Sequence, residues 1–344
     1  MTTTLEEFFK LRDQIPTADV RSEGEFQSGH VPGSISIPVL NDQERKAVGT
    51  DYKRKGKETA IETGHALVAP RLHEMMEQAK SVAHANELLV YCWRGGLRSE
   101  KFCDFATNAG IKTRRLQGGY KTYRQFALQT FSKPYRLMVV GGKTGSGKTE
   151  ILEQLKAHGE QVIDLEFLAN HKGSAFGGLM RGKQPTTEQF QNNLFEALMK
   201  IDIDRRLWIE DESMSIGRVF IPEGFWQQKA AAPVMQVEMN TTERIERLVN
   251  EYSPADRNEF LQSMEKITER LGGQNFNAAK ELLLKGDWHG TIEILLYYYD
   301  KTYLYSLGKK KSQIIGTVEW ASNQSNQPSV AERMIEMAQS FQQR

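Results

Sequence analysis

One cysteine, in a turn rich in glycine and arginine, is the residue of this sequence best suited to covalent chemistry. Cys92 ends a short apolar stretch, and Arg94, Gly95, Gly96 and Arg98 follow it. Opposite charge and inward-pointing backbone N–H groups both favour a cysteine thiolate, which is the nucleophilic form. The turn therefore predicts a reactive sulfur, with the two arginines as its electrostatic support. The alternative is a small buried thiol that ends a core strand.

A phosphate-binding motif lies further along the chain. Residues 142–149 fit the pattern G-x-x-x-x-G-K-[ST] at every fixed position. The glycines let successive N–H groups curl around phosphate oxygens, Lys148 supplies a point charge, and Thr149 can reach Mg²⁺. The sequence thus predicts a cradle for a di- or triphosphate, formed by Gly142, Lys143, Thr144, Gly145, Ser146, Gly147, Lys148 and Thr149.

Acidic residues follow two apolar stretches that come after this motif. The stretches at 161–165 and 207–209 alternate with helical segments, which favours a parallel sheet whose ligands bind at the carboxyl ends of the strands. One acid there could order Mg²⁺ or its water, so Mg²⁺ is a candidate ion, although no residue is assigned as a metal ligand. We favour Glu210 or Asp211 for this role, and the sequence does not decide between them. The acids in question are Asp164, Glu166, Glu210, Asp211 and Glu212.

Two further segments carry clustered positive charge. Residues 171–183 hold four glycines, three cations and no acid, which favours a substrate or phosphate loop over a solvated connection. Residues 111–136 hold seven cations and no acid. The second segment could meet a nucleic-acid backbone or form a solvated basic face, and its charge alone does not decide between them.

Length and composition set the frame for these motifs. The chain has 344 residues and a net charge of +1, with 39% apolar and 26% charged residues, as in an ordinary globular protein of about two domains. No apolar run approaches the roughly 20 residues that span a bilayer, so no membrane role is indicated. The start lacks the layout of a secretory signal, and we therefore expect a cytoplasmic protein with reduced cysteines.

The elements that must position the motifs can be expected from periodicity and turn residues. We expect an N-terminal α/β domain over 1–132 and a P-loop domain with a mainly parallel sheet and a helical C-terminal part over 133–344, since Pro134 ends a helix and an apolar strand follows. In the first domain, residues 41–86 are expected to add a polar segment and then a helix near 66–79. The expected fold class is α/β throughout.

Three separated segments of the first domain resemble the signatures of rhodanese domains. They cover positions 15–125 in the family's order, and Asp19 and Arg21 among them are expected to form a structural ion pair. The resemblance implies an α/β module whose loop cysteine, here Cys92, carries sulfur or selenium, with Arg94 and Arg98 holding an anion. The matching residues are Asp19–Arg21, Glu25–Phe26, Gly29–Val31, Gly33–Ser34 and Pro38, then Cys92–Arg98, then Gln117–Gly119.

Almost the whole chain resembles the tRNA 2-selenouridine synthase family. The resemblance implies a selenotransferase with tRNA geranyltransferase activity, which converts wobble 2-thiouridine to 2-selenouridine. Its implied co-substrates are selenophosphate and geranyl diphosphate, with an S-geranyl intermediate. Its implied partners are the tRNA anticodon loop and a selenophosphate-supplying enzyme. The resemblance is carried by 92–99, 141–149, 171–177, 210–213, 216–217 and 222–226.

Two other classes of function remain open at this point. The phosphate cradle is equally compatible with an NTP-dependent sulfurtransferase or kinase. The cysteine loop is compatible with a non-catalytic sulfur carrier or a redox sensor.

Overall fold

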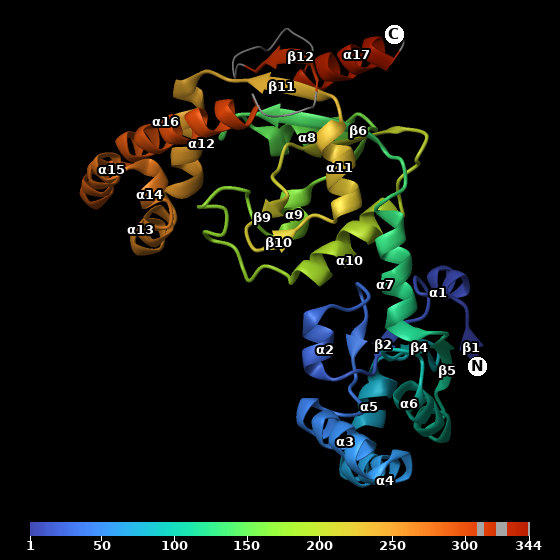
Figure 1. The fold of residues 1–344 in the computed structure, drawn as a ribbon. Helices are drawn as coiled ribbons and strands as arrows, with labels where there is room; N and C mark the ends of the chain where they lie inside the picture. The colour runs from blue at the N-terminus through green and yellow to red at the C-terminus, as the bar shows by residue number, and fades with distance from the viewer. Residues whose placement is uncertain (308–312, 321–328, 343–344) are drawn as a thin grey trace. The chain divides into compact units, whose positions relative to one another are not determined.

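The chain forms two compact units (Figure 1). The computed structural model describes residues 1–307, 313–320 and 329–342. The first unit comprises Met1–Thr130 and Gln191–Glu196, and the second comprises Phe131–Phe190 and Ala197–Arg344. The first division thus falls between Thr130 and Phe131, and a short piece of a later helix groups with the first unit.

The first unit is built on a parallel sheet of five strands. The strands lie in the order β1, β5, β4, β2, β3, and every neighbouring pair is parallel. The central strand β4 is almost uniformly apolar, with Leu88, Leu89 and Val90 fully buried, as expected of a strand covered on both faces. The strands are β1 (Thr2–Thr3), β2 (Thr17–Asp19), β3 (Ile35–Ser36), β4 (Glu87–Tyr91) and β5 (Lys112–Leu116).

The helices of this unit connect successive strands, so the predicted α/β class is confirmed. In α6, Phe102 and Ala106 are fully buried and form the apolar stripe that faces the core. The helices are α1 (Leu5–Leu11), α2 (Glu23–Ser28), α3 (Asp42–Lys55), α4 (Lys57–Val68), α5 (Leu72–Val82), α6 (Leu97–Asn108) and α7 (Gly119–Thr130).

The segment between β3 and β4 differs from the sequence-based expectation. It forms α3, α4 and α5, with a 3₁₀ turn at Ala69–Arg71, instead of a polar segment followed by one helix. Asn41 and Glu44 make a capping box that starts α3, and Gly56, at φ +96°, separates α3 from α4. No residue of α3 is buried, so the apolar periodicity that indicates a helix is absent from its sequence.

The described residues of the second unit form another five-stranded parallel sheet. Its order is β12, β11, β6, β8, β7, which places the strand that precedes the phosphate-binding motif at the centre. Met138, Val140, Met235 and Val237 point to one face, where α8 and α17 cover them. The strands are β6 (Arg136–Gly142), β7 (Gln161–Ile163), β8 (Arg206–Glu210), β11 (Val234–Glu238) and β12 (Ile314–Glu319).

The rest of the described part of the second unit is mainly helical. Two further strands, β9 (Ser215–Ile216) and β10 (Val219–Phe220), form a separate antiparallel pair. None of the described helices is both long and apolar enough to span a membrane. The helices are α8 (Lys148–Ala157), α9 (Leu165–Ala169), α10 (Thr187–Leu198), α11 (Glu223–Ala231), α12 (Thr241–Tyr252), α13 (Arg257–Glu265), α14 (Thr268–Leu271), α15 (Gly273–Lys285), α16 (Trp288–Leu307) and α17 (Val330–Gln342).

Candidate functional site

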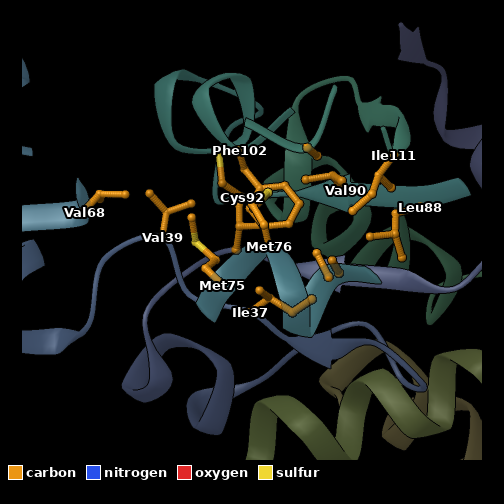
Figure 2. Packing of buried hydrophobic residues seen from close by; sticks show 14 of the residues in the cluster. Ile37, Val39, Val68, Met75, Met76, Leu88, Val90, Cys92, Phe102 and Ile111 are labelled. Carbon is orange, nitrogen blue, oxygen red and sulfur yellow. The ribbon is translucent and has the colours of Figure 1, made fainter. Parts of the chain in front are cut away.

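Cys92 directly follows β4, in a loop that leads into α6. Its side chain is 3% exposed and belongs to the buried cluster of the first unit, with Phe102 and Met76 beside it (Figure 2). The Sγ atom lies 3.2 Å from Ser99 Oγ and 3.9 Å from the Gly96 carbonyl oxygen. The thiol is thus held at a defined position by groups of its own loop and of the first turn of α6.

Close backbone contact with the first turn of α7 holds the Cys92 loop in shape. The N–H of Tyr120 donates to the Cys92 carbonyl at 2.9 Å, and the N–H of Lys121 donates to that of Trp93 at 2.9 Å. A Cβ on Gly119, which has φ +62°, would lie 2.2 Å from the Cys92 carbonyl oxygen. Only glycine fits there, which explains why the sequence needs the Gly-Gly turn as well as the cysteine loop.

The two predicted arginines occupy different environments. Arg98 lies in the first turn of α6 and donates two hydrogen bonds to Glu25, at 2.5 and 3.1 Å. Burial opposes ionisation of Glu25, but the hydrogen bonds and charge of Arg98 outweigh it and lower its pKa to about 2. Arg94 is exposed, and no ion pair joins it to the described residues. Arg94 is therefore the cation of the loop that can meet an incoming anion, while Arg98 ties α6 to α2.

The ion pair predicted within the first rhodanese-like signature is confirmed. Arg21 Nη2 lies 2.6 Å from Asp19 Oδ2, and both side chains are almost completely buried. The Arg21 guanidinium also lies 4.0 Å from the centroid of the Tyr120 ring. Since the backbone of Tyr120 is bonded to the Cys92 carbonyl, this pair supports the cysteine loop through the Tyr120 ring.

In the second unit, the phosphate-binding motif has the local structure that it requires. Gly142 ends β6, residues 143–147 form the loop, and Lys148 and Thr149 begin α8. The Lys148 ammonium folds back to the Gly142 carbonyl oxygen at 3.1 Å. The Ser146 hydroxyl is buried and has no hydrogen-bond partner among the described residues. Both groups are therefore available to a phosphate in the cradle.

Side chains distant in sequence brace this loop. Arg244 of α12 is 1% exposed, donates through Nε to the Thr144 carbonyl at 2.9 Å, and pairs with Asp300 at 2.5 Å. Lys143 lies 3.7 Å from the same carboxylate. Gly147, at φ +77°, packs against Trp320, whose ring a Cβ there would meet at 2.2 Å. Sequence patterns do not show these contacts, because the partners come from distant elements.

The predicted acids gather at the carboxyl ends of β7 and β8. Glu210 accepts a hydrogen bond from the Glu166 N–H at 2.6 Å, and its other oxygen is buried without a partner among the described residues. Burial and the charge of Asp164 raise the pKa of Glu210. Asp211 instead lies 3.4 Å from Lys229, and both side chains are buried. Of the two favoured acids, Asp211 is therefore paired with a cation, whereas Glu210 keeps one carboxylate oxygen without a partner among the described residues.

Glu166 and Glu212, two of the candidate acids that we did not favour from the sequence, form a hydrogen-bonded pair. Burial and the charge of Glu212 raise the pKa of Glu166 to about 9, and burial likewise raises the pKa of Glu212. The charge of Lys148 acts on both and partly offsets this effect. Gly173, from the glycine-rich loop, covers the pair closely, since a Cβ there would lie 2.5 Å from Glu212 Oε2. The pair is thus suited to hold one proton next to the phosphate cradle.

The acids near the cradle do not form a recognisable metal site among the residues that the structure describes. No group of three or more His, Cys, Asp or Glu side chains is arranged there to hold a metal ion. The described side chains include a buried cysteine thiol in one unit and, in the other, a glycine-rich loop with Lys148 and a carboxyl pair.

Family models match both units. The model described as the tRNA 2-selenouridine synthase AAA domain matches residues 135–327, which is more than half of the chain. The model described as the rhodanese-like domain matches residues 4–126. The two matches follow one another in the order that the sequence motifs indicate.

Relatives match over most of the chain, and the following three are all named tRNA 2-selenouridine synthase. The Shewanella pealeana protein is 35% identical, over 87% of this chain and 91% of the relative. The Shewanella oneidensis protein is 34% identical over 94% and 97%, and the Nitrosomonas europaea protein is 31% identical over 86% and 90%. A solved N-terminal domain from Clostridium difficile 630, of a protein described as ATP/GTP binding, is 35% identical over 37% of this chain and 99% of its own, with a TM-score of 0.35.

Proposed function

Because the chain belongs to the tRNA 2-selenouridine synthase family, we propose that it replaces the sulfur of wobble 2-thiouridine in tRNA by selenium. The observation that carries this proposal is the presence, in one chain, of a buried loop cysteine and a separate phosphate-binding motif. The first unit holds Cys92 in a fixed glycine-bounded loop, and the second holds a phosphate cradle in which the Ser146 hydroxyl has no partner among the described residues. A substitution that needs both activation and exchange requires two such sites.

The first step of the proposal is S-geranylation at the cradle. The sulfur on carbon 2 of the uridine attacks carbon 1 of geranyl diphosphate, the carbon–oxygen bond breaks, diphosphate leaves, and the base loses its N3 proton. Gly142–Thr149 would hold the diphosphate through backbone N–H groups, and Lys148 would neutralise its charge as it departs. The step is useful because alkylation turns a poor sulfur leaving group into a good one.

The second step is selenation at the Cys92 loop. Acting as a nucleophile, the Cys92 sulfur displaces geranylthiolate from carbon 2, and the selenium of selenophosphate then displaces Cys92. Water finally cleaves the phosphorus–selenium bond, which yields phosphate and 2-selenouridine. This sequence consumes no oxidant or reductant. The exposed Arg94 is the cation placed to meet the selenophosphate anion, which a selenophosphate-forming enzyme would supply.

Mass spectrometry of tRNA nucleosides from cells with and without the protein tests the proposal. Loss of 2-selenouridine, with build-up of its thio or geranylthio precursor, is the expected result. Unchanged 2-selenouridine would contradict it. Phosphate release from ATP without tRNA would instead favour an NTP-dependent transferase or kinase, and modification of Cys92 without a tRNA product would favour a sulfur carrier.

A further inference from the structure

A cavity with apolar walls adjoins the Cys92 loop within the first unit. Its volume is about 140 Å³, and its lining comes from α3, α4, the start of α6 and the chain after β3. Two lining residues, Tyr52 and Leu97, are 59% and 43% exposed and mark its open side. Exposure of large apolar side chains to water is unfavourable. The exposed Tyr52 and Leu97 at the opening of the cavity therefore indicate a surface that a ligand covers.

The polar side chains around this cavity carry one sign of charge. The walls include Val39, Val48, Ala60, Ile61, Val68 and Phe105, and no acid is among the lining residues. Lys57, Arg98 and Lys101 line it together with His65. Arg98 and Lys101 already pair with carboxylates, whereas no ion pair joins Lys57 to the described residues. Apolar walls with a cationic rim match a hydrocarbon chain attached to an anionic molecule.

The cavity lies next to the Cys92 loop in the chain and shares part of its packing, although Cys92 itself is not among the lining residues. Leu97 and Arg98 are the first residues of α6, directly after the cysteine loop. Val39 and Val68 line the cavity and belong to the same buried cluster as Cys92 (Figure 2). A chain bound in the cavity would therefore hold its polar end near the cysteine loop.

The size of the cavity limits what it can hold. An apolar cavity of about 150 Å³ takes up a molecule the size of benzene, so 140 Å³ suits one five-carbon isoprene unit, with a second unit at the open side against Leu97. By comparison, the cavity beside Thr144 in the second unit measures about 20 Å³, roughly the space of one water molecule. Of these two cavities, only the one in the first unit can receive an isoprene unit of a ten-carbon chain.

Resting on the function proposed above, we propose that this cavity binds the geranyl chain of S-geranyl-2-thiouridine in tRNA and presents carbon 2 of the base to Cys92. The intermediate fits better than free geranyl diphosphate for two reasons. The cavity adjoins the proposed exchange site, and the Lys57 ammonium at its edge can pair with a phosphate of the RNA backbone. Binding here would distinguish the activated base from unmodified 2-thiouridine, so selenation would proceed only after geranylation.

The variant Ala60→Leu tests this assignment by filling the cavity. Ala60 is 4% exposed and lines the cavity, while Ala66 on the same helix is exposed and does not line it, so Ala66→Leu is the matched control. Equilibrium binding of tRNA with S-geranyl-2-thiouridine is compared with that of tRNA with 2-thiouridine. Wild type and Ala66→Leu should bind the geranylated tRNA more tightly than the thiolated tRNA. In Ala60→Leu, the ratio of the two affinities should fall by at least about tenfold.

Turnover with geranyl diphosphate, selenophosphate and thiolated tRNA gives the second readout. Ala60→Leu should accumulate geranylated tRNA and form little selenouridine. Retained preference and full selenation would overturn the assignment. Loss of geranylation, together with loss of binding of free geranyl diphosphate, would also overturn it and would place the donor in this cavity.

A second variant guards against misfolding of the first. Tyr52→Ser removes an exposed wall residue and should weaken binding of geranylated tRNA while leaving binding of thiolated tRNA unchanged. Equal binding of both tRNAs by wild type and Tyr52→Ser would count against the cavity. If wild type forms no geranylated tRNA at all, the proposed function fails instead, and direct binding of synthetic geranylated tRNA still decides on the cavity.

Discussion

Ser99 Oγ lies 3.2 Å from Cys92 Sγ and also 3.0 Å from the Gly96 carbonyl oxygen. A hydroxyl group has one proton, so it can donate either to the carbonyl or to the sulfur. When the sulfur is protonated, Ser99 can donate to Gly96 and accept from the thiol. When the sulfur is ionised, the hydroxyl can turn and donate to it, and the loop thus supports both states of Cys92 without moving its backbone.

The Ser99→Ala variant should therefore lower the reactivity of Cys92. A hydrogen bond to a charged group is lost, and we expect alkylation of Cys92 by iodoacetamide at neutral pH to slow by about tenfold. Selenation should fall with it, whereas geranylation should persist. Ser99→Thr keeps the hydroxyl and serves as the control. An unchanged alkylation rate in Ser99→Ala would show that the contact is only structural.

Replacement of Cys92 by Ala should abolish selenation of geranylated tRNA. Geranylation should continue, because it is assigned to the cradle in the second unit, so geranylated tRNA should accumulate in nucleoside mass spectra. Cys103→Ala is the matched control, since Cys103 is half-buried and burial raises the pKa of its thiol. Full selenation by Cys92→Ala would refute the role of this sulfur.

Replacement of Lys148 by Ala should remove geranylation. The ammonium would no longer neutralise the departing diphosphate, and we expect a loss of at least about a hundredfold in thioether formation from geranyl diphosphate. Selenation of tRNA that is already geranylated should survive. Lys156→Ala, an exposed position on the same helix, is the control. Undiminished thioether formation would place the prenyl donor elsewhere.

The pair of Arg98 with Glu25 predicts a pH dependence of stability. The pKa of Glu25 is about 2 in the folded protein and ordinarily 4.5. The ion pair therefore makes its full contribution to the stability of the folded state above about pH 4.5, and this contribution is lost as the pH falls toward 2. Glu25→Gln should lower the melting temperature at pH 7, have a smaller effect at pH 3, and have almost none below pH 2.

The control for this measurement is Glu6→Gln. Glu6 pairs with Lys10 at 2.6 Å, but both side chains are more than two-thirds exposed, so the pair should contribute little to stability. A melting temperature that Glu25→Gln leaves unchanged at both pH values would show that Arg98 does not depend on this carboxylate.

The motifs could be located from the sequence because their chemistry lies in short runs. Cys92 and Arg98 belong to one turn, and Lys148 follows a run of glycines, so spacing alone indicates both sites. The family resemblance and α/β class were confirmed by the family matches and the sheets. The roles of the individual residues stay predictions.

What sequence patterns did not show depends on contacts between distant residues. Glu25 meets Arg98 across 73 positions, and Arg244 meets the Thr144 carbonyl across 100. The cavity of the first unit was missed for a second reason. Its wall includes α3, which has no buried residue and thus no apolar period to reveal a helix.

The position of β12 bears on how the chain is made. β11 pairs with β6 on one side and with β12 on the other, yet β12 is the last of the described strands to be synthesised. At about 5–20 residues per second, a ribosome would need several seconds to pass from β11 to β12. During that time the nascent chain carries β11, with its buried Val234, Met235 and Val237, as an open sheet edge. Pauses in translation between these strands would therefore lengthen the interval in which the polypeptide needs a chaperone.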